Sequence, residues 1–349
     1  MTVHDHRTPG PGTTHLVMPD SVGTWFHHFT RLKPADRVIA LGESAPLTAS
    51  DLAAEPRSGH PGNLLVFHSS HDTLLRDRAL ADELTALGVR TLCQSAAASV
   101  LALDKVLMKE FFDEHGVPTL PWVRAGGRPG WTGPAVVKSR TGTQSAGMTL
   151  RHDCGPGGPG PDEYWEQYAD GIEYSVVVYR DAAGWATLPP VWKGATSSEL
   201  VPPWRRLLMS PYFAPDDALE GRLRDLAVRI AELVDCRGHM EVEYLVEHDG
   251  RIRVLEINPR VAGTMRIAAM AADVPIFSLC DLAATRGHLP AVRHAAEQPY
   301  QGTPFADPEL GVFATSRLTV SAESLGEAVD RLHRLCGHVL AEQPALATA

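Results

Sequence analysis

The segment from Met240 to Arg260, MEVEYLVEHDGRIRVLEINPR, contains two runs of strand-forming residues on either side of Asp249-Gly250. Asp-Gly is a favoured two-residue turn between antiparallel strands. Pro259 follows the second run and has no N–H to give to a strand ladder, so the second strand ends there. The segment therefore predicts a β-hairpin with a tight turn.

Acidic side chains face each other across this predicted hairpin. With a two-residue turn, Glu243 lies opposite Glu256, and Glu241 lies opposite Asn258, all on one face. Like charges at the cross-strand distance of about 4.5–5.5 Å repel each other, and a divalent cation between them removes that cost. Carboxylate and amide oxygens suit magnesium, especially when substrate phosphates complete its shell. The hairpin thus predicts a magnesium site made of Glu243, Glu256 and Asn258.

A solvated acidic surface is the alternative interpretation of this face. The same register places the apolar residues Leu245 and Val254 on it, which argues against free exposure to water. Asn258-Pro259-Arg260 also extends the polar row with an amide and a guanidinium. A metal site remains the favoured interpretation.

Composition restricts the class of protein. The chain has 349 residues, of which 44% are hydrophobic and 21% charged, as expected for two or three folded domains. The net charge of −10, with no polybasic stretch, argues against a nucleic acid or an anionic membrane as partner. Five cysteines without a Cys-x-x-Cys pair and no apolar run of about 20 residues predict a cytoplasmic protein with reduced thiols.

Upstream of the hairpin, strand-like and helix-like segments alternate. Residues 37–42, 63–67 and 89–93 read as short buried strands, and residues 72–87 carry leucines at helical spacing. This alternation predicts an α/β layer over about residues 35–100. Residues 104–116 read as a helix opened by Asp104 and closed by a glycine.

The sequence resembles that of ATP-grasp enzymes, which include biotin carboxylases, carbamoyl-phosphate synthases and amino-acid ligases. Leu255-Glu-Ile-Asn-Pro-Arg260, with an acid upstream, resembles the magnesium-binding segment of this family, and the resemblance covers about residues 100–285. Four further landmarks lie upstream of this segment, in the order that the family has them. Asp104-Lys105 and Val136-Val-Lys138 resemble the family's phosphate lysines. Trp165-Glu-Gln-Tyr-Ala169 resembles the adenine hinge, and Glu173 the ribose acid.

The resemblance implies an α/β (α+β) ATP-grasp fold in three parts. After a flexible tail (1–20) we expect an N-terminal α/β pre-ATP-grasp domain (21–100). A helix and lid (101–178, with the lid at about 118–168) and a C-terminal ATP-grasp domain with an antiparallel sheet (179–349) complete the fold. The family usually has a helix between the lid's glycine loop and the hinge, whereas only residues 151–164, rich in glycine and proline, lie there in this chain. We therefore expect a small lid.

The resemblance also implies a ligand set. Residues expected to bind ATP are Lys105, Lys138, Ser145, Gly147, Glu166, Gln167, Ala169 and Glu173. The small, donor-rich loop from Ser139 to Gly147 suits a phosphate-binding loop, with an ordinary turn as the alternative. The expected metal is magnesium, as two ions for which manganese can substitute.

The implied reaction is amide formation. A carboxylate attacks the γ-phosphate of ATP, and an amine displaces phosphate from the resulting acyl phosphate. Lys138 and Arg260 are the expected catalytic residues, and Arg266, Lys193 and Gly263 the candidates for substrate binding. A structural ion pair is the alternative role for Arg260, and a surface position the alternative for Arg266.

Two other functions stay open. A carboxylase acting through carboxyphosphate would need a carrier domain, of which the sequence shows no sign. A non-catalytic nucleotide-binding regulator would not need both lysines and all three metal ligands. The expected partners are a small-molecule carboxylate and an amine, often an amino acid, in a biosynthetic reaction, with neither nucleic acid nor membrane. The family resemblance also suggests a homodimer.

Overall fold

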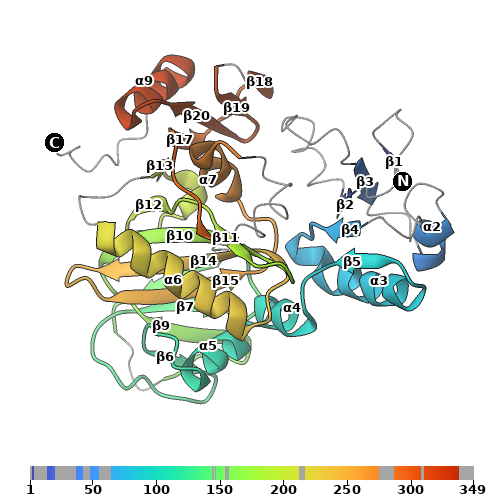
Figure 1. Ribbon diagram of the computed structural model, residues 1–349. Coiled ribbons are helices and arrows are strands. Elements are labelled where there is room, and N and C mark those ends of the chain that lie inside the picture. The colour runs from blue at the N-terminus through green and yellow to red at the C-terminus, as the bar shows by residue number, and fades with distance from the viewer. Residues whose placement is uncertain are drawn as a thin grey trace.

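The computed structural model describes residues 2–3, 14–19, 37–41, 48–54, 64–143, 145, 147–153, 157–211, 217–274, 287–307 and 310–337. These residues form three β-sheets with helices packed against them. In Figure 1 the N-terminal sheet stands to one side, the small sheet lies at the bottom, and the largest sheet fills the remainder. The mixed architecture with a large antiparallel sheet confirms the predicted fold class. Among the described residues, no helix has the length and apolar character that a membrane span requires.

The N-terminal sheet is parallel except at one edge. Its order is β1-β3-β2-β4-β5, and only β1 runs antiparallel to its neighbour. The strands are β1 (Thr2–Val3), β2 (Thr14–Pro19), β3 (Arg37–Leu41), β4 (Leu64–Phe67) and β5 (Arg90–Leu92). The prediction of a flexible tail over residues 1–20 does not hold for residues 14–19, because β2 lies in the middle of this sheet with Val17 fully buried. Its apolar run is only three residues long, too short to stand out from a polar N-terminus.

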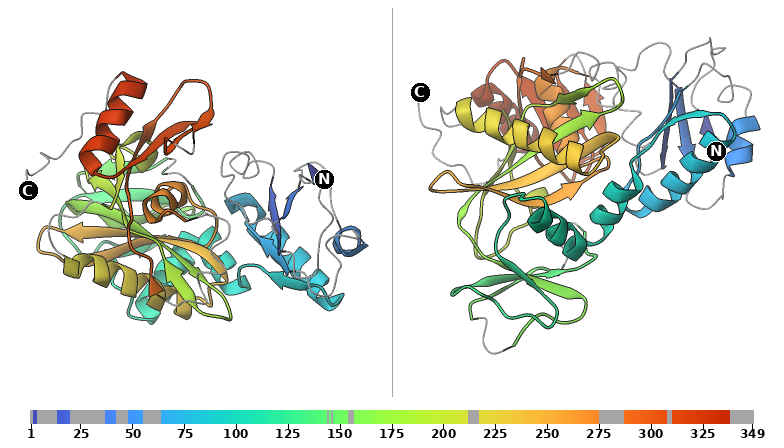
Figure 2. Two further views of the ribbon diagram at one scale, coloured as in Figure 1. Left: turned by 45° about the horizontal axis from the view of Figure 1, so that its top comes forward. Right: turned by 60° about the horizontal axis from the view of Figure 1, so that its bottom comes forward.

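Helices pack against this sheet and lead from it into the rest of the molecule. They are α2 (Ala49–Ala54), the 3-10 turn η1 (His71–Thr73), α3 (Leu74–Ala86), α4 (Ala96–Leu103) and α5 (Lys105–Glu114). Figure 2 shows α4 and α5 between the N-terminal sheet and the other two sheets. Asp104 separates α4 from α5, and its side chain accepts hydrogen bonds from the N–H groups of Val106 and Leu107. This N-cap fixes the start of α5, and therefore the position of Lys105.

We expect Asp104→Ala to lower the free energy of unfolding by about 1–2 kcal/mol, because it removes this N-cap. The same carboxylate also accepts two hydrogen bonds from Arg140, at 2.6 and 2.8 Å. Urea unfolding of the full-length protein measures the effect. The matched control is Glu114→Ala at the exposed C-terminal end of the same helix. Equal stability of the two variants would contradict a structural role for the cap.

The smallest sheet has four antiparallel strands. The described residues that connect these strands form no helix. Its order is β6-β9-β7-β8. The strands are β6 (Trp122–Arg124), β7 (Ala135–Ser139), β8 (Thr149–Arg151) and β9 (Glu163–Gln167). We call residues 118–168 the lid, and its sheet carries Lys138 on β7 and Glu166 on β9.

The largest sheet runs in the order β15-β14-β10-β12-β13-β17-β20-β19-β18, with β11 paired to β10 and β16 paired to β11. Its first half consists of β10 (Gly171–Arg180), β11 (Trp185–Thr187), β12 (Val191–Ala195), β13 (Leu208–Ser210), β14 (Gly238–Glu247) and β15 (Ile252–Asn258). Its second half consists of β16 (Gly287–His288), β17 (His294–Pro299), β18 (Phe305–Asp307), β19 (Val312–Ala314) and β20 (Arg317–Ala322). The domain boundary predicted after residue 178 falls inside β10.

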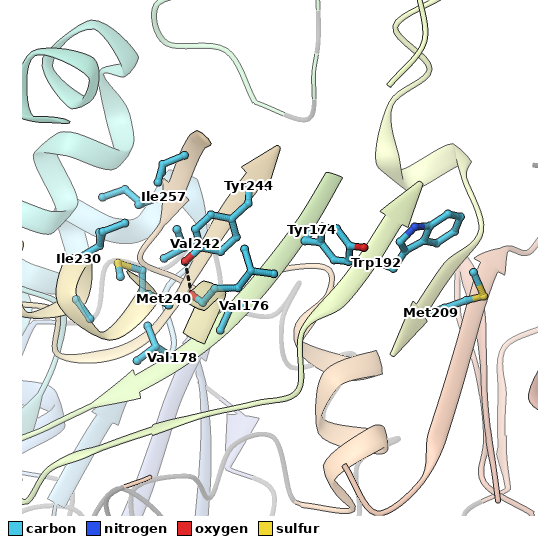
Figure 3. Packing of buried hydrophobic residues seen from close by; sticks show 14 of the residues in the cluster. Tyr174, Val176, Val178, Trp192, Met209, Ile230, Met240, Val242, Tyr244 and Ile257 are labelled. Carbon is cyan, nitrogen blue, oxygen red and sulfur yellow. Dashed lines mark hydrogen bonds between the residues drawn. The ribbon is translucent and has the colours of Figure 1, made fainter. Parts of the chain in front are cut away.

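Helices cover both faces of the largest sheet. They are α6 (Asp217–Leu233), α7 (Met265–Ala272) and α9 (Leu325–Cys336), with the 3-10 turn η2 (Pro203–Arg205) before β13. Alternate residues of β10 point to opposite faces, as in any strand. Val176 and Val178 pack in one core with Ile230 of α6, together with Tyr244 and Ile257 of the hairpin. Figure 3 shows this packing, and Figure 1 shows α6 lying across the strands.

The second face of β10 supports α7. Val177 and Tyr179 pack with Met265 and Ile267 in a separate cluster. The hairpin strands β14 and β15 contribute apolar residues to the first core, and β14 pairs with β10 along its full length. A rigid platform therefore carries the acidic residues of the hairpin.

The hairpin has the predicted pairing but not the predicted turn. Glu243 pairs with Glu256 and Glu241 with Asn258, as expected. The connection, however, is a three-residue loop over 248–250. Glu247 N–H donates to Arg251 O, Gly250 N–H donates to Glu247 O, and Gly250 lies in the left-handed region at φ 81°.

A bulge at Leu255 restores the expected register beyond the loop. Tyr244 pairs with Val254, whereas the next residue of β14, Glu243, already pairs with Glu256. Leu255 is the extra residue, as in a β-bulge. The expectation that Leu245 and Val254 share a face is therefore wrong. Val254 packs in the core with Tyr244, and Leu245 lines the cavity described next.

Candidate active site

A cavity lies between the lid sheet, the start of α5 and the acidic face of the hairpin. Most residues predicted to bind ATP or metal line it, namely Lys105, Lys138, Ser145, Glu166, Gln167, Ala169, Glu173, Glu243 and Glu256. They come from four separate parts of the chain. Gly142 and Met148 of the glycine loop also contribute, and Ser145 and Gly147 adopt positive φ of 59° and 73°. Gly142, Ser145 and Met148 therefore lie at the same cavity as Lys138.

Lys138 is held by a buried carboxylate. Its Nζ donates to Glu166 Oε2, and the second oxygen of Glu166 accepts from Lys109 Nζ. Burial by itself lowers the pKa of Lys138, but the Glu166 carboxylate outweighs it and raises that pKa, so Lys138 carries a positive charge. The side chain of Glu166 is only 1% exposed. Its carboxylate is thus engaged by two lysines, and contact with adenine would fall to backbone groups of the hinge.

Lys105 lies against the second carboxylate of the hairpin. Its Nζ donates to Glu256 Oε2 at 2.7 Å, and its backbone N–H donates to Arg140 O of the lid at 2.9 Å. Because Arg140 also pairs with Asp104, the first turn of α5 is tied to the lid strand that carries Lys138. This contact brings the two predicted phosphate lysines to one cavity.

Glu243 is paired with Lys193 of β12 at 2.8 Å, and the amide of Asn258 donates to Glu243 Oε1 at 3.1 Å. Burial alone raises the pKa of Glu243, but the positive charges of Lys193, Lys105 and Arg260 together lower that pKa. Burial raises the pKa of the neighbouring Glu241, whose carboxylate accepts from Thr264. Lys193 therefore stands beside the acidic row and forms ion pairs with Glu241 and Glu243.

The residues fit a hard divalent cation whose coordination shell is completed by phosphate oxygens. Among the residues that the structure describes, no group of three or more His, Cys, Asp or Glu side chains is arranged to hold a metal ion alone. Glu243 and Glu256 nevertheless face each other across the hairpin, and their side chains are 22% and 25% exposed to the cavity. Two carboxylates and an amide leave coordination positions for substrate oxygens, which is the usual magnesium arrangement.

Glu173, the expected ribose acid, is anchored by an arginine that sequence reasoning missed. Arg206 Nη1 donates to Glu173 Oε1 at 3.0 Å, and its Nε donates to Val201 O at 2.6 Å. Arg206 is 5% exposed and ties the segment from Thr196 to Pro203 against the cavity. Its sequence context, Trp204-Arg-Arg206, reads as an ordinary surface segment, so no signal marked it.

The other predicted residues lie outside the cavity lining. Asn258, Lys193 and Arg260 sit directly behind it, and Arg260 Nη2 donates to Asn258 Oδ1 at 2.9 Å. The segment after Arg260 contacts the N-terminal domain, since Val261 N–H donates to Ser69 O at 3.3 Å. Gly263 is exposed, and its neighbour Thr264 starts the turn into α7.

Arg266 is neither exposed nor at the cavity. It is 2% exposed and donates from Nε and Nη2 to Glu297 Oε2, at 3.0 and 2.7 Å. The alternative of a surface arginine is therefore wrong. The geometry gives Arg266 a buried partner in β17 and offers no support for a grip on substrate.

Comparison with known proteins gives a consistent assignment of the fold. The family model described as "Carbamoyl-phosphate synthase L chain, ATP binding domain" matches residues 208–288, which include the hairpin. The D-alanine–D-alanine ligase of Oleidesulfovibrio alaskensis is 26% identical over 274 residues, which cover 72% of this chain and 82% of the relative.

Two solved structures share the architecture over nearly the whole chain. The L-amino acid ligase from Bacillus licheniformis has a TM-score of 0.65 at 13% identity and covers 94% of this chain and 98% of its own. The N5-carboxyaminoimidazole synthetase from Staphylococcus aureus, complexed with ADP, has a TM-score of 0.66 at 15% identity, covering 95% and 98%. At these identities the likeness establishes the fold.

Proposed function

We propose that this chain, which has the ATP-grasp fold and resembles the carboxylate–amine ligases of that fold, joins a small carboxylate to an amine with cleavage of ATP to ADP and phosphate. The observation that supports the proposal most is the convergence of Lys105, Lys138, Glu243 and Glu256 on one cavity. A protein that only sensed nucleotide would need affinity for ATP, but not two lysines opposite a pair of carboxylates.

The residues have distinct tasks in this reaction. Lys138, on a rigid strand beside the glycine loop, neutralises charge on the phosphates, and Lys105 adds a second cation from the opposite side. The hinge residues Gln167 and Ala169 line the adenine end, and Glu173 the ribose end. Magnesium bound by Glu243, Glu256 and Asn258 supplies further stabilisation of charge on the transferred phosphoryl group.

The proposed chemistry has two balanced steps. An oxygen of the substrate carboxylate bonds to the γ-phosphorus of ATP, and the bond to the β-phosphate oxygen breaks, releasing ADP. The amine nitrogen then bonds to the acyl carbon, the bond from that carbon to the phosphate oxygen breaks, and the amine loses a proton. Arg260, whose Nη2 donates to Asn258 Oδ1, is the residue proposed to hold the negative oxygen that develops in the second step. D-alanine–D-alanine ligase and L-amino acid ligase among the similar proteins support an amino acid as one substrate.

The first test incubates the purified protein with magnesium-ATP and pools of amino acids and other small carboxylates. The expected result is release of phosphate and ADP that depends on the pool, with Glu256→Ala as the blank. AMP and pyrophosphate as products would contradict phosphoryl transfer. Turnover that depends on bicarbonate would favour a carboxylase instead, in keeping with the similarity to the carboxyaminoimidazole synthetase.

A further inference from the structure

A second buried lysine, which the proposed mechanism does not use, sits behind the phosphate lysine. Lys109 of α5 is fully buried, and its Nζ donates to Glu166 Oε1 and, at 2.6 Å, to Thr119 Oγ1. A third contact joins it to Val254 O at 3.4 Å. The opposite oxygen of Glu166 accepts from Lys138. The three side chains form one connected group, which we call the lysine–glutamate–lysine group.

The contacts of Lys109 are those of an ammonium. Thr119 donates its own hydroxyl proton to Val254 O at 2.8 Å, so it accepts the proton from Lys109. A carboxylate, a hydroxyl oxygen and a carbonyl oxygen together match the three N–H donors of a charged lysine. Although burial lowers the pKa of Lys109, the adjacent Glu166 carboxylate opposes that effect.

The charge balance of the group bears directly on Lys138. If Glu166 faced Lys138 alone, the two would form a neutral pair, and the ammonium would attract phosphate weakly. With Lys109 present, the charge of Glu166 is balanced by Lys109 on its other oxygen. The group then keeps a net charge of one positive unit, at Lys138, on the side exposed to the cavity. Only Lys138 among the three has notable exposure, 16% against 0% and 1%.

We infer that Lys109 is a positioning residue that acts through Glu166 to keep Lys138 available, as a full positive charge, for the phosphates of ATP. Lys109 also fixes where Lys138 lies. Thr119 and Val254 form the bridge at which the lid joins strand β15, and Val254 N–H donates to Pro118 O at 2.7 Å. Lys109 therefore fixes the position of Glu166, and through it that of Lys138, where Pro118 and Thr119 of the lid contact β15.

The inference rests on the proposed use of ATP, and direct binding measurements separate the two. Calorimetry on the full-length protein compares ATP, ADP and adenosine, with magnesium absent. We expect Lys109→Met to weaken binding of ATP roughly tenfold, because a unit charge at the phosphate end is cancelled, and to leave adenosine binding unchanged. Lys109→Arg, which keeps the charge, is expected to bind ATP within about twofold of the wild type.

The decisive variant is the double substitution Lys109→Met with Glu166→Gln. It removes one charge of each sign, so Lys138 again carries a net positive charge, and ATP affinity should recover most of the loss seen in Lys109→Met. A purely structural role predicts that the second substitution adds damage. Glu166 retains Lys138 as a partner in Lys109→Met, so that variant is expected to fold, and its circular dichroism spectrum checks this.

Three results would overturn the inference: unchanged ATP affinity in Lys109→Met, parallel loss of ATP and adenosine affinity, or a double variant no better than the single one. If the wild type binds adenosine and ATP equally well, the phosphates are not recognised, and the inference fails while a nucleoside site remains. If the wild type binds neither, the proposed function fails, and this inference with it.

Discussion

Glu256→Gln is expected to reduce ligase turnover by about 10²–10³-fold, the size of effect seen when one group that stabilises transition-state charge is removed. Glutamine keeps the shape of the side chain and can still accept the hydrogen bond that Lys105 donates at 2.7 Å. It lacks the negative charge that, opposite Glu243, the proposed reaction requires for binding a divalent cation. Phosphate release under saturating ATP measures the loss.

The matched control for this prediction is Glu247→Gln. Glu247 belongs to the same hairpin, but it pairs with Arg251 and Arg253 at the loop end and does not line the cavity. Its turnover should stay within about twofold of the wild type. The concentration of magnesium that gives half-maximal turnover should rise in Glu256→Gln and not in the control. Equal turnover of both variants would contradict the proposal that the hairpin binds magnesium.

Lys138→Met is expected to lower kcat/KM for ATP by about 10²-fold or more, because in the proposed reaction its ammonium neutralises charge on the phosphates. Methionine preserves the length of the apolar part of the side chain. Glu166 keeps Lys109 as a partner, so the buried carboxylate is not left without a cation. The fold should therefore survive the substitution.

Arg124→Met provides a matched removal of a cation from the same lid. Arg124 is largely exposed and pairs with Glu110 on α5, outside the cavity lining. Kinetics at varied ATP concentrations should show near-wild-type values for Arg124→Met. A Lys138→Met variant with unchanged kcat/KM would show that phosphate is bound elsewhere in the protein.

The hairpin shows how far the sequence determines the site. The pairing of Glu243 with Glu256 follows from the strand pattern, yet the predicted two-residue turn is wrong. Two deviations compensate: the loop is longer, with Gly250 in the left-handed region, and a bulge at Leu255 shifts the register back. Turn type is set by local backbone conformation, and a bulge by packing against Pro118 and Thr119 from the lid, which adjacent sequence does not reveal.

Other features depended on contacts between distant segments. Lys109 is one helical turn after Lys105 and three residues before the buried Phe112, so a lysine on an apolar helix face was a signal that could have been recognised. Arg206 gave no such signal, because its importance comes from Glu173, far away in the sequence. Arg266 was a candidate for substrate binding because it lies six residues after Arg260. Its partner Glu297 lies in a strand that has no recognisable motif, so the ion pair could not be predicted.

Transfer of ¹⁸O from the substrate carboxylate to phosphate tests most directly whether the γ-phosphate of ATP activates a carboxylate. With the carboxylate found in the pool assay labelled by ¹⁸O in both oxygens, an acyl phosphate intermediate must pass one labelled oxygen to the released phosphate, because the second step breaks the carbon–oxygen bond. We predict one ¹⁸O in each phosphate, measured by mass spectrometry, and ADP in equal amount. Unlabelled phosphate, or label in AMP, would contradict activation of a carboxylate by the γ-phosphate of ATP.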